Sequence, residues 1–220
     1  MSIPIVEIFN SIEGEGARSG KLCTFVRTAG CNLRCSYCDT TYSYDIAQAR
    51  QYEIKQLVEQ VEKVAQCYTV TLTGGEPLIH KDVRDCFIPW LLERGYDINI
   101  ETNGSVDLAQ IKRPKHSKLM FTMDWKSPSS GMNDKMLEEN LRILQPRDVL
   151  KFVVGSEEDL NEMLRVVESY AIVAQIYVSP VFGKIEMADI VEFMKANKLD
   201  NVRLQVQLHK IIWDPNKRGV

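Results

Sequence analysis

Short runs of β-branched and apolar residues alternate with helical patterns from about residue 50 to the end of the chain. Most of these runs end in glycine, proline or a polar residue, as strands do, and they fall at 68–74, 96–104, 118–126, 149–155, 175–180 and 201–208. Such alternation predicts a parallel sheet with right-handed crossovers. A complete eight-unit barrel takes about 250 residues, and this chain holds too few units. We therefore predict an α/β fold, an incomplete TIM-like barrel of parallel strands with helices outside.

Three helices are predicted between these strands because apolar residues recur at helical spacing. The stripes cover Ile54 to Val64, Leu160 to Val167 and Met187 to Met194. Ser156 and Asp159 resemble a capping pair before the second stripe. A further helix follows KDVRDCF, where Pro89 should kink or restart it. We assign the methionines of these stripes to the core.

Composition limits the domain count and the class of protein. With 45% hydrophobic and 26% charged residues, the chain has the composition of an ordinary globular protein. Its 220 residues suffice for one sizeable core. We predict a single domain over 1–220, with an N-terminal strand and turn at 1–20, a loop at 30–42 and a βα core running to the C-terminus.

The sequence predicts neither a membrane protein nor a nucleic-acid binder. The first residues lack the pattern of a secretory signal, and no apolar run approaches the roughly 20 residues of a membrane helix. The net charge of -3 argues against a nucleic-acid binder, which needs a basic excess. One basic segment, KRPKHSK at 112–118, is either a solvated loop or a docking patch for an acidic partner.

Half of the six cysteines lie in the stretch GCNLRCSYCDTTY, residues 30–42. Cys31, Cys35 and Cys38 are odd in number and too close together for disulfide pairing, so they indicate a soft metal or an iron-sulfur cluster. Structural zinc is an alternative that needs a fourth ligand, for which Cys23, Cys67, Cys86 or His80 are the candidates. Free clustered cysteines without export predict a reducing, cytoplasmic setting.

Four polar segments follow four of the predicted strands. The cysteine stretch follows LCTFVRT, GGEP follows YTVTLT, TNG follows INIE, and DWKSPSS follows LMFTM. In parallel sheets, the chemistry gathers at the carboxyl ends of the strands. We therefore expect all four segments to meet on one rim.

A 4Fe-4S cluster on three cysteines leaves one iron without a protein ligand, open to a bound molecule. The spacing CxxxCxxC, with an aromatic residue before the third cysteine, resembles the radical S-adenosylmethionine superfamily. The resemblance implies that the open iron chelates S-adenosylmethionine and that an electron from the cluster produces a 5'-deoxyadenosyl radical. GGEP matches the superfamily's methionine-binding stretch, where glycines allow close approach. The implied S-adenosylmethionine contacts are Tyr37, Cys38, Asp39, Gly75, Glu76, Asp124, Lys126 and Ser179.

The longer stretch EIFNSIEGEGARSGKLCTFVRTAGCNLRCSYCDTTY, residues 7–42, resembles the 7-carboxy-7-deazaguanine synthase family. ETNG, KSPSS and the tail QLHKIIWDPNKRGV recur there in the same order, so the resemblance covers the chain end to end. It implies a carbon-nitrogen lyase that converts 6-carboxy-5,6,7,8-tetrahydropterin to 7-carboxy-7-deazaguanine by ring contraction with loss of ammonia. The radical takes the C6 hydrogen, S-adenosylmethionine is regenerated, and the product feeds queuosine and deazapurine biosynthesis.

A planar pterin with a carboxylate needs a charged clamp and polar backbone groups. Arg27 can hold a carboxylate by two hydrogen bonds, and it shares a strand face with Cys23 and Phe25. The remaining substrate contacts that the resemblance implies are Ile12, Glu13, Gly14, Thr73 and, if the tail folds back, Val220.

The resemblance also implies Mg²⁺ bound at Thr40, since a hard cation takes oxygen ligands, together with a flavodoxin-like electron donor and a homodimer. The chain departs from the family where many members have Ser-Pro-Lys and it has Asp124, Trp125 and Lys126. Two alternatives remain open: an activase that places a glycyl radical on a partner protein, and a non-catalytic iron-sulfur carrier or sensor.

Overall fold

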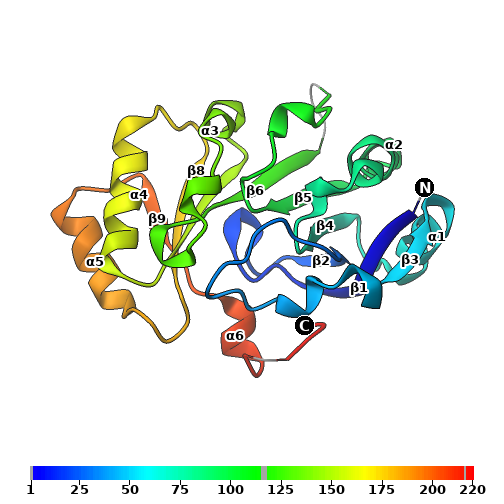
Figure 1. The fold of residues 1–220 in the computed structure, drawn as a ribbon, viewed down its shortest axis with the longest axis horizontal. Coiled ribbons are helices and arrows are strands. Elements are labelled where there is room, and N and C mark those ends of the chain that lie inside the picture. Colours follow the sequence, from blue (N-terminus) through cyan, green and yellow to red (C-terminus); the bar gives the residue numbers. More distant parts are fainter. Residues whose placement is uncertain (1, 115–117, 216) are drawn as a thin grey trace.

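A mixed sheet, open at both edges, forms the centre of the computed structural model (Figure 1). The structure describes residues 2–114, 118–215 and 217–220. The described strands are β1 (Ser2–Ile12), β2 (Leu22–Thr28), β3 (Arg50–Glu53), β4 (Thr69–Gly74), β5 (Asp97–Thr102), β6 (Leu119–Trp125), β7 (Val149–Val154), β8 (Gln175–Pro180) and β9 (Val202–Leu204). Their order is β3-β1-β2-β4-β5-β6-β7-β8-β9.

Strand direction confirms the predicted incomplete barrel. β1 runs antiparallel to both β2 and β3, whereas β2 and β4 to β9 are parallel to one another. Because the order ends at β3 and β9 without a closing pair, the parallel strands form part of a barrel and leave its interior accessible from one side.

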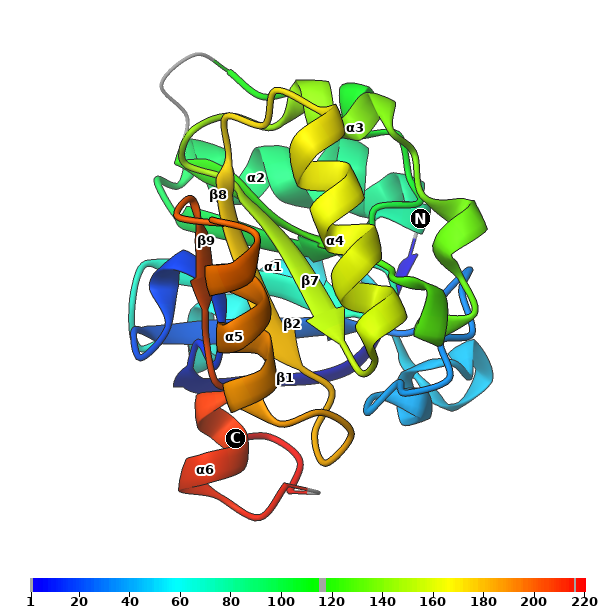
Figure 2. The same cartoon turned by 90° about the vertical axis from the view of Figure 1, so that its left-hand side faces the viewer.

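The described helices are α1 (Ile54–Val64), α2 (Ile88–Glu93), α3 (Glu139–Ile143), α4 (Glu157–Ser169), α5 (Met187–Ala196) and α6 (Leu208–Ile212). α1, α4 and α5 match the three predicted stripes. Figure 2 shows α4 and α5 packed side by side on the outer face of β7 to β9. Met163 is fully buried, as predicted, but Met187 is 43% exposed, so the assignment of every methionine to the core is wrong there.

Two helix starts show how local sequence sets the backbone. The Ser156 hydroxyl accepts from the backbone N–H of Asp159 at 3.3 Å and caps α4. Before α2, a π-helical turn covers Val83–Phe87, and Pro89 lies in the first turn of the helix. The helical backbone runs from this π-helical turn into α2 without a break, so the structure shows no restart at the proline, whose missing N–H is tolerated in the first turn.

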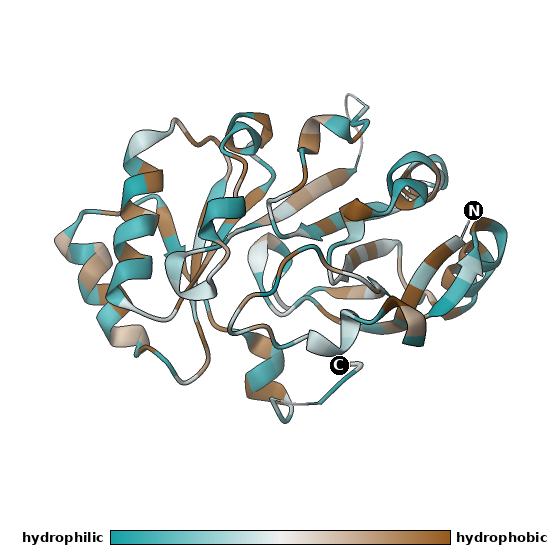
Figure 3. Cartoon of the chain, viewed as in Figure 1, coloured by the Kyte–Doolittle hydropathy of each residue, from teal (hydrophilic) through white to brown (hydrophobic). Residues whose placement is uncertain are grey.

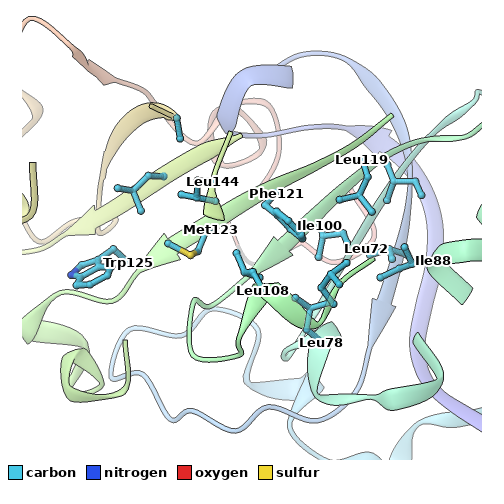
Figure 4. Packing of buried hydrophobic residues seen from close by; sticks show 14 of the residues in the cluster. Leu72, Leu78, Ile88, Ile100, Leu108, Leu119, Phe121, Met123, Trp125 and Leu144 are labelled. Atoms are coloured by element: carbon cyan, nitrogen blue, oxygen red, sulfur yellow. The ribbon is translucent and has the colours of Figure 1, made fainter. Parts of the chain in front are cut away.

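The two faces of the parallel strands differ in chemistry. The outer face carries Leu72, Ile100, Phe121 and Phe152, all at most 1% exposed, and the helices cover it (Figure 4). The helices in turn present their hydrophilic sides outward (Figure 3). Because successive side chains alternate between faces, the residues between these apolar ones point into the open barrel. The site is built there.

The last predicted strand is wrong in its second half. Of residues 201–208, only Val202–Leu204 form β9, and α6 begins at Leu208. The backbone N–H of Leu208 donates to the Gly14 carbonyl at 3.0 Å, which pulls the chain away from the sheet. Among the described helices, none has the length and apolar character needed to cross a membrane.

Candidate active site

The cysteine loop is hydrogen-bonded at the carboxyl end of the sheet to the turn that follows β6. The backbone N–H of Ser36 donates to Ser130 O at 3.0 Å, and its hydroxyl donates to Ser129 O at 2.6 Å. Both acceptors lie in the turn that follows β6. The predicted meeting of the cysteine stretch with KSPSS on one rim is therefore present in the fold.

Cys31, Cys35 and Cys38 are free and half-buried. Burial raises the pKa of the Cys31 and Cys35 thiols. The backbone N–H of Leu33 and the Asn103 amide donate to Cys31 Sγ at 3.4 and 3.7 Å. Hydrogen bonds of this kind stabilise a thiolate ligand, so the loop offers soft donors that suit an iron-sulfur cluster.

The alternative of a single zinc ion gains no support from the geometry. In the described part of the chain, no three His, Cys, Asp or Glu side chains lie close enough to hold one metal ion. Of the candidate fourth ligands, His80 has its Nε2 2.7 Å from Ala29 O. Cys23 is fully buried, and Cys67 and Cys86 are half-buried and free.

GGEP is packed directly against the cysteine loop. The N–H groups of Gly75 and Glu76 donate to Thr28 O at 3.2 Å and to Gly30 O at 2.8 Å. A Cβ on Gly75 would collide with the Gly30 carbonyl. Only glycine fits this approach, so the sequence of the turn fixes its distance from Cys31.

Glu76, an expected contact of S-adenosylmethionine, is fully buried in the structure. Its carboxylate is 0% exposed and accepts from Leu78 N at 3.0 Å, from Asn103 N at 2.6 Å and from the Thr102 hydroxyl at 3.0 Å. Burial raises its pKa to about 7, although these donors act in the opposite direction. Glu76 thus joins GGEP to TNG, and its contact with a ligand remains a prediction.

Asp124 and Lys126 form a half-buried ion pair at the end of β6. Lys126 Nζ lies 2.7 Å from Asp124 Oδ2, and Lys151 Nζ lies 3.1 Å from Asp124 Oδ1. Burial alone would raise the pKa of Asp124, but the two ammonium groups outweigh it and hold that pKa below its ordinary value. The charge of Lys126 also acts on Cys35, so this pair lies beside the cysteine loop.

Three further residues of the predicted S-adenosylmethionine set have polar contacts of their own. The Tyr37 hydroxyl donates to Val153 O at 3.4 Å, and burial raises its pKa to about 12. The Ser179 hydroxyl donates to Glu15 Oε1 at 2.7 Å. Asp39 pairs with Lys210 at 3.0 Å and accepts from the Thr40 hydroxyl at 2.9 Å. Tyr37 and Asp39 belong to the cysteine stretch of the predicted rim, whereas Ser179 lies near the carboxyl end of β8.

The turn after β1 closes one side of the open barrel. Glu13 is 1% exposed, contacts the hydroxyl of Thr71 and accepts from the Asn99 amide at 3.3 Å. Burial and the nearby charge of Glu101 raise its pKa to about 7. Ile12 ends β1, and the Gly14 carbonyl accepts from Leu208. The turn is therefore held against the C-terminal segment.

Arg27 points inward, as alternation along β2 predicts. Its Nε lies 2.7 Å from Glu7 Oε1, which also accepts from the Tyr42 hydroxyl at 3.2 Å. The Arg218 guanidinium lies 3.8 Å from the centre of the Tyr42 ring. The tail that ends at Val220 therefore folds back toward Arg27, and Figure 1 shows the C-terminus beside the first strands.

Several polar residues of the interior were not predicted from sequence: Glu7, Glu15, Tyr42, Asn99, Glu101 and Lys151. Thr73, which was predicted, donates to Glu101 Oε2 at 2.6 Å. The missed signal is clearest at Lys151, a charged residue inside the otherwise apolar run VLKFVV. A charged side chain in a buried strand has to be paired, and that requirement alone marks Lys151 as a candidate.

The basic segment 112–118 does not lie near the cysteine loop where it is described. Its described residues, 112–114 and 118, directly precede β6, so they lie at the amino end of that strand, opposite the rim. Arg113 is buried and pairs with Asp148 at 2.6 Å, so its side chain is not part of a docking surface. Residues 115–117 lie outside the described part of the chain.

Comparison with known proteins gives the family. The radical SAM superfamily profile matches residues 25–195. A 7-carboxy-7-deazaguanine synthase from Clostridium acetobutylicum is 43% identical over 224 residues, covering 100% of both chains. The chain belongs to the 7-carboxy-7-deazaguanine synthase family. A synthase from Methanospirillum hungatei is 38% identical, covering 96% of this chain and 86% of its own.

Family membership makes the chain a radical SAM lyase, and the superfamily implies a 4Fe-4S cluster and S-adenosylmethionine. The fold has a counterpart among solved structures as well. The crystal structure of QueE from Escherichia coli superposes with a TM-score of 0.71 at 21% identity, covering 94% of both chains. At that identity the match supports the fold alone.

Proposed function

We propose that this chain converts 6-carboxy-5,6,7,8-tetrahydropterin to 7-carboxy-7-deazaguanine by radical ring contraction with loss of ammonia, a step of queuosine and deazapurine biosynthesis. One observation carries the proposal. The cysteine loop, GGEP and the turn after β6 are hydrogen-bonded together beside a polar interior that contains Arg27, Glu13 and Glu101. An iron-sulfur carrier has no need of such an interior.

Cys31, Cys35 and Cys38 would hold the 4Fe-4S cluster. Their free thiols, and the hydrogen-bond donors beside Cys31, fit such a cluster. When bound and reduced, such a cluster would supply the electron for reductive cleavage of S-adenosylmethionine. The chain's own part is to position this cofactor. Gly75 lets the cofactor approach the backbone closely. The Lys126 ammonium and the Asp124 carboxylate offer it one positive and one negative charge. Tyr37, Cys38, Asp39, Glu76 and Ser179 complete the proposed contacts.

Arg27 would bind the carboxylate of the pterin. Its guanidinium is 16% exposed and engages Glu7 through Nε, which leaves terminal N–H groups for a second carboxylate. Glu13 has a raised pKa near neutrality, so it can hold or give up a proton beside the pterin ring. The backbone of Ile12 and Gly14, the Thr73 hydroxyl and the Val220 carboxylate are the other proposed contacts.

Thr40 would bind Mg²⁺, with its hydroxyl and the adjacent Asp39 carboxylate as hard oxygen donors. We also propose a cytoplasmic homodimer that receives electrons from a flavodoxin-like donor, without nucleic acid or membrane partners. The donor should approach the rim near the cysteine loop rather than segment 112–118. A single domain over 1–220 is consistent with one sheet that takes in every described strand.

The test is an anaerobic reaction with the reconstituted protein. It contains dithionite, S-adenosylmethionine, Mg²⁺ and 6-carboxytetrahydropterin, and mass spectrometry detects the products. We expect 7-carboxy-7-deazaguanine from the unsubstituted chain and from Cys86→Ala, but none from Cys35→Ala. If 5'-deoxyadenosine forms without the deazapurine, the substrate assignment fails and a glycyl-radical activase becomes the better account. If neither forms in a fully loaded sample, the carrier or sensor account replaces the proposal.

A further inference from the structure

Lys151 is a buried ammonium group between two carboxylates. Its side chain is 9% exposed, and Nζ lies 3.1 Å from both Glu15 Oε2 and Asp124 Oδ1. An ammonium group is stable in such a position only if it is paired. Burial alone would lower its pKa, but the two partners and the charge of Glu101 raise it well above its ordinary value. Lys151 is therefore charged at every physiological pH.

Lys151 joins two groups of ion pairs and hydrogen bonds into one network. On one side, Asp124 pairs with Lys126 at 2.7 Å. On the other side, Glu15 accepts from the Ser179 hydroxyl at 2.7 Å and from the Gln207 amide at 3.3 Å. Without the Lys151 ammonium, the described contacts would separate into two clusters, one on β6 and one on the turn after β1.

One cluster lies in the proposed S-adenosylmethionine site, and the other joins the SIEGEG turn to Ser179, which is itself a proposed S-adenosylmethionine contact. Lys126 and Asp124 lie beside the cysteine loop, where we proposed the S-adenosylmethionine contacts. Glu15 lies in the SIEGEG turn, to which we assigned the pterin. The side chain of Lys151 thus spans the boundary between the two sites, and it can respond to a charge placed on either side.

We propose that Lys151 is a positioning residue that couples the binding of the two ligands, an inference that rests on the proposed function. S-adenosylmethionine carries positive charge, and a cationic ligand near Asp124 weakens the hold of that carboxylate on Lys151. The ammonium then binds Glu15 more strongly and fixes the SIEGEG turn for the pterin. Each ligand therefore strengthens the binding of the other by the same factor, as linkage requires.

Charge balance makes the Lys151→Met variant informative. In the unsubstituted chain, Lys151 pairs with Glu15 and Asp124, and the charge of Glu101 also acts on it. After the substitution, Lys126 still pairs with Asp124, whereas Glu15 loses its only described cationic partner. The route from one ligand site to the other is then absent. Lys151→Arg keeps the charge and should keep the coupling.

The experiment measures binding without turnover. The reconstituted, oxidised protein is titrated anaerobically with S-adenosylmethionine by calorimetry, with and without saturating 6-carboxytetrahydropterin. In the unsubstituted chain we expect the pterin to tighten S-adenosylmethionine binding by about fivefold or more. Lys151→Arg and the control Lys195→Met, whose lysine is exposed on α5, should behave alike. In Lys151→Met the factor should fall below about twofold.

Glu15→Gln provides a second route to the same link if Lys151→Met does not fold by circular dichroism. It neutralises the other partner while Lys151 still pairs with Asp124, and it should also abolish the coupling. Equal coupling in these variants and the unsubstituted chain overturns the inference, as does the absence of coupling in the unsubstituted chain. If the unsubstituted chain does not bind the pterin at all, the proposed function fails, and the inference fails with it.

Discussion

Phe121 and Thr122 are neighbours on β6 and point to opposite faces of the sheet. Phe121 is 1% exposed and packs under the helices. Thr122 points into the open barrel, where its hydroxyl donates to Asn99 Oδ1 at 2.9 Å. The same contrast recurs on the next strand, where Phe152 packs outward and Lys151 pairs inward.

This difference separates stability from chemistry along each strand. The outer face buries large apolar side chains, whose transfer from water dominates folding. The inner face holds charged side chains that are stable in a buried position because they are paired, as Lys151 and Asp124 are. Substitutions on the outer face should therefore change the free energy of unfolding, whereas those on the inner face should mainly change binding and activity.

The largest effect is expected on the outer face. Phe121→Ala should lower the free energy of unfolding by about 3–5 kcal/mol, because it removes a buried ring and leaves a cavity. Urea denaturation of the cluster-free chain measures this loss. The kcat/KM of the fraction that stays folded should remain close to that of the unsubstituted chain. A full loss of activity without a loss of stability would break the comparison.

The next effect is a pH dependence from the inner face. The pKa of Glu13 is raised from 4.5 to about 7, so the folded chain keeps a proton that the unfolded chain releases. The stability that Glu13 contributes is therefore fully present below pH 4.5. This contribution falls by about 3 kcal/mol as the pH rises to about 7. Glu76, also raised to about 7, adds a decrease of the same sign.

Glu13→Gln tests the share of this group, because a neutral amide takes the place of the protonated acid. Urea denaturation across that pH range should give a flatter curve for the variant than for the unsubstituted chain. An identical slope in both proteins would show that Glu13 is ionised in the fold throughout.

Arg27→Lys should affect activity more than stability. Lysine keeps the charge but loses the planar pair of donors, so kcat/KM should fall by roughly 10- to 100-fold, equivalent to about 1.5–3 kcal/mol. Arg94→Lys, at an exposed pair with Glu62, is the matched control and should leave kcat/KM unchanged. Equal kcat/KM for Arg27→Lys and the unsubstituted chain would remove Arg27 from the pterin site.

The smallest effect is expected for Thr122→Val, which removes one hydroxyl from the inner face at nearly constant volume. The lost hydrogen bond to Asn99 should lower the free energy of unfolding by about 0.5–1.5 kcal/mol. Chemical denaturation beside Phe121→Ala gives the ratio between the two faces of one strand. A loss as large as that of Phe121→Ala would contradict the division between them.

The sequence predicts the strands well because their β-branched runs are short and end in turn residues. β7 and β8 begin at the predicted residues, and α1 matches its predicted stripe. The rim was also predictable, since parallel strands place their carboxyl ends together. The end of β9 was not predictable, because the contact of Leu208 with Gly14 depends on tertiary structure.

The contacts between polar side chains in the interior could not be predicted from the spacing of residues in the sequence. Lys151 and Glu15 are 136 residues apart, and nothing local to either residue names the other. Glu76 was recognised from its motif, yet its burial beneath Thr102 and Asn103 depends on the neighbouring strand. Family resemblance supplied the reaction, and the three-dimensional structure was needed to find which charges balance one another.

The central claim is that the inner face supports one specific radical ring contraction, and one ratio tests it most directly. In a single anaerobic reaction, mass spectrometry would measure the amounts of 7-carboxy-7-deazaguanine and 5'-deoxyadenosine. Because the proposed reaction regenerates S-adenosylmethionine, we predict that the deazapurine exceeds 5'-deoxyadenosine. Accumulation of 5'-deoxyadenosine without any deazapurine would contradict the claim.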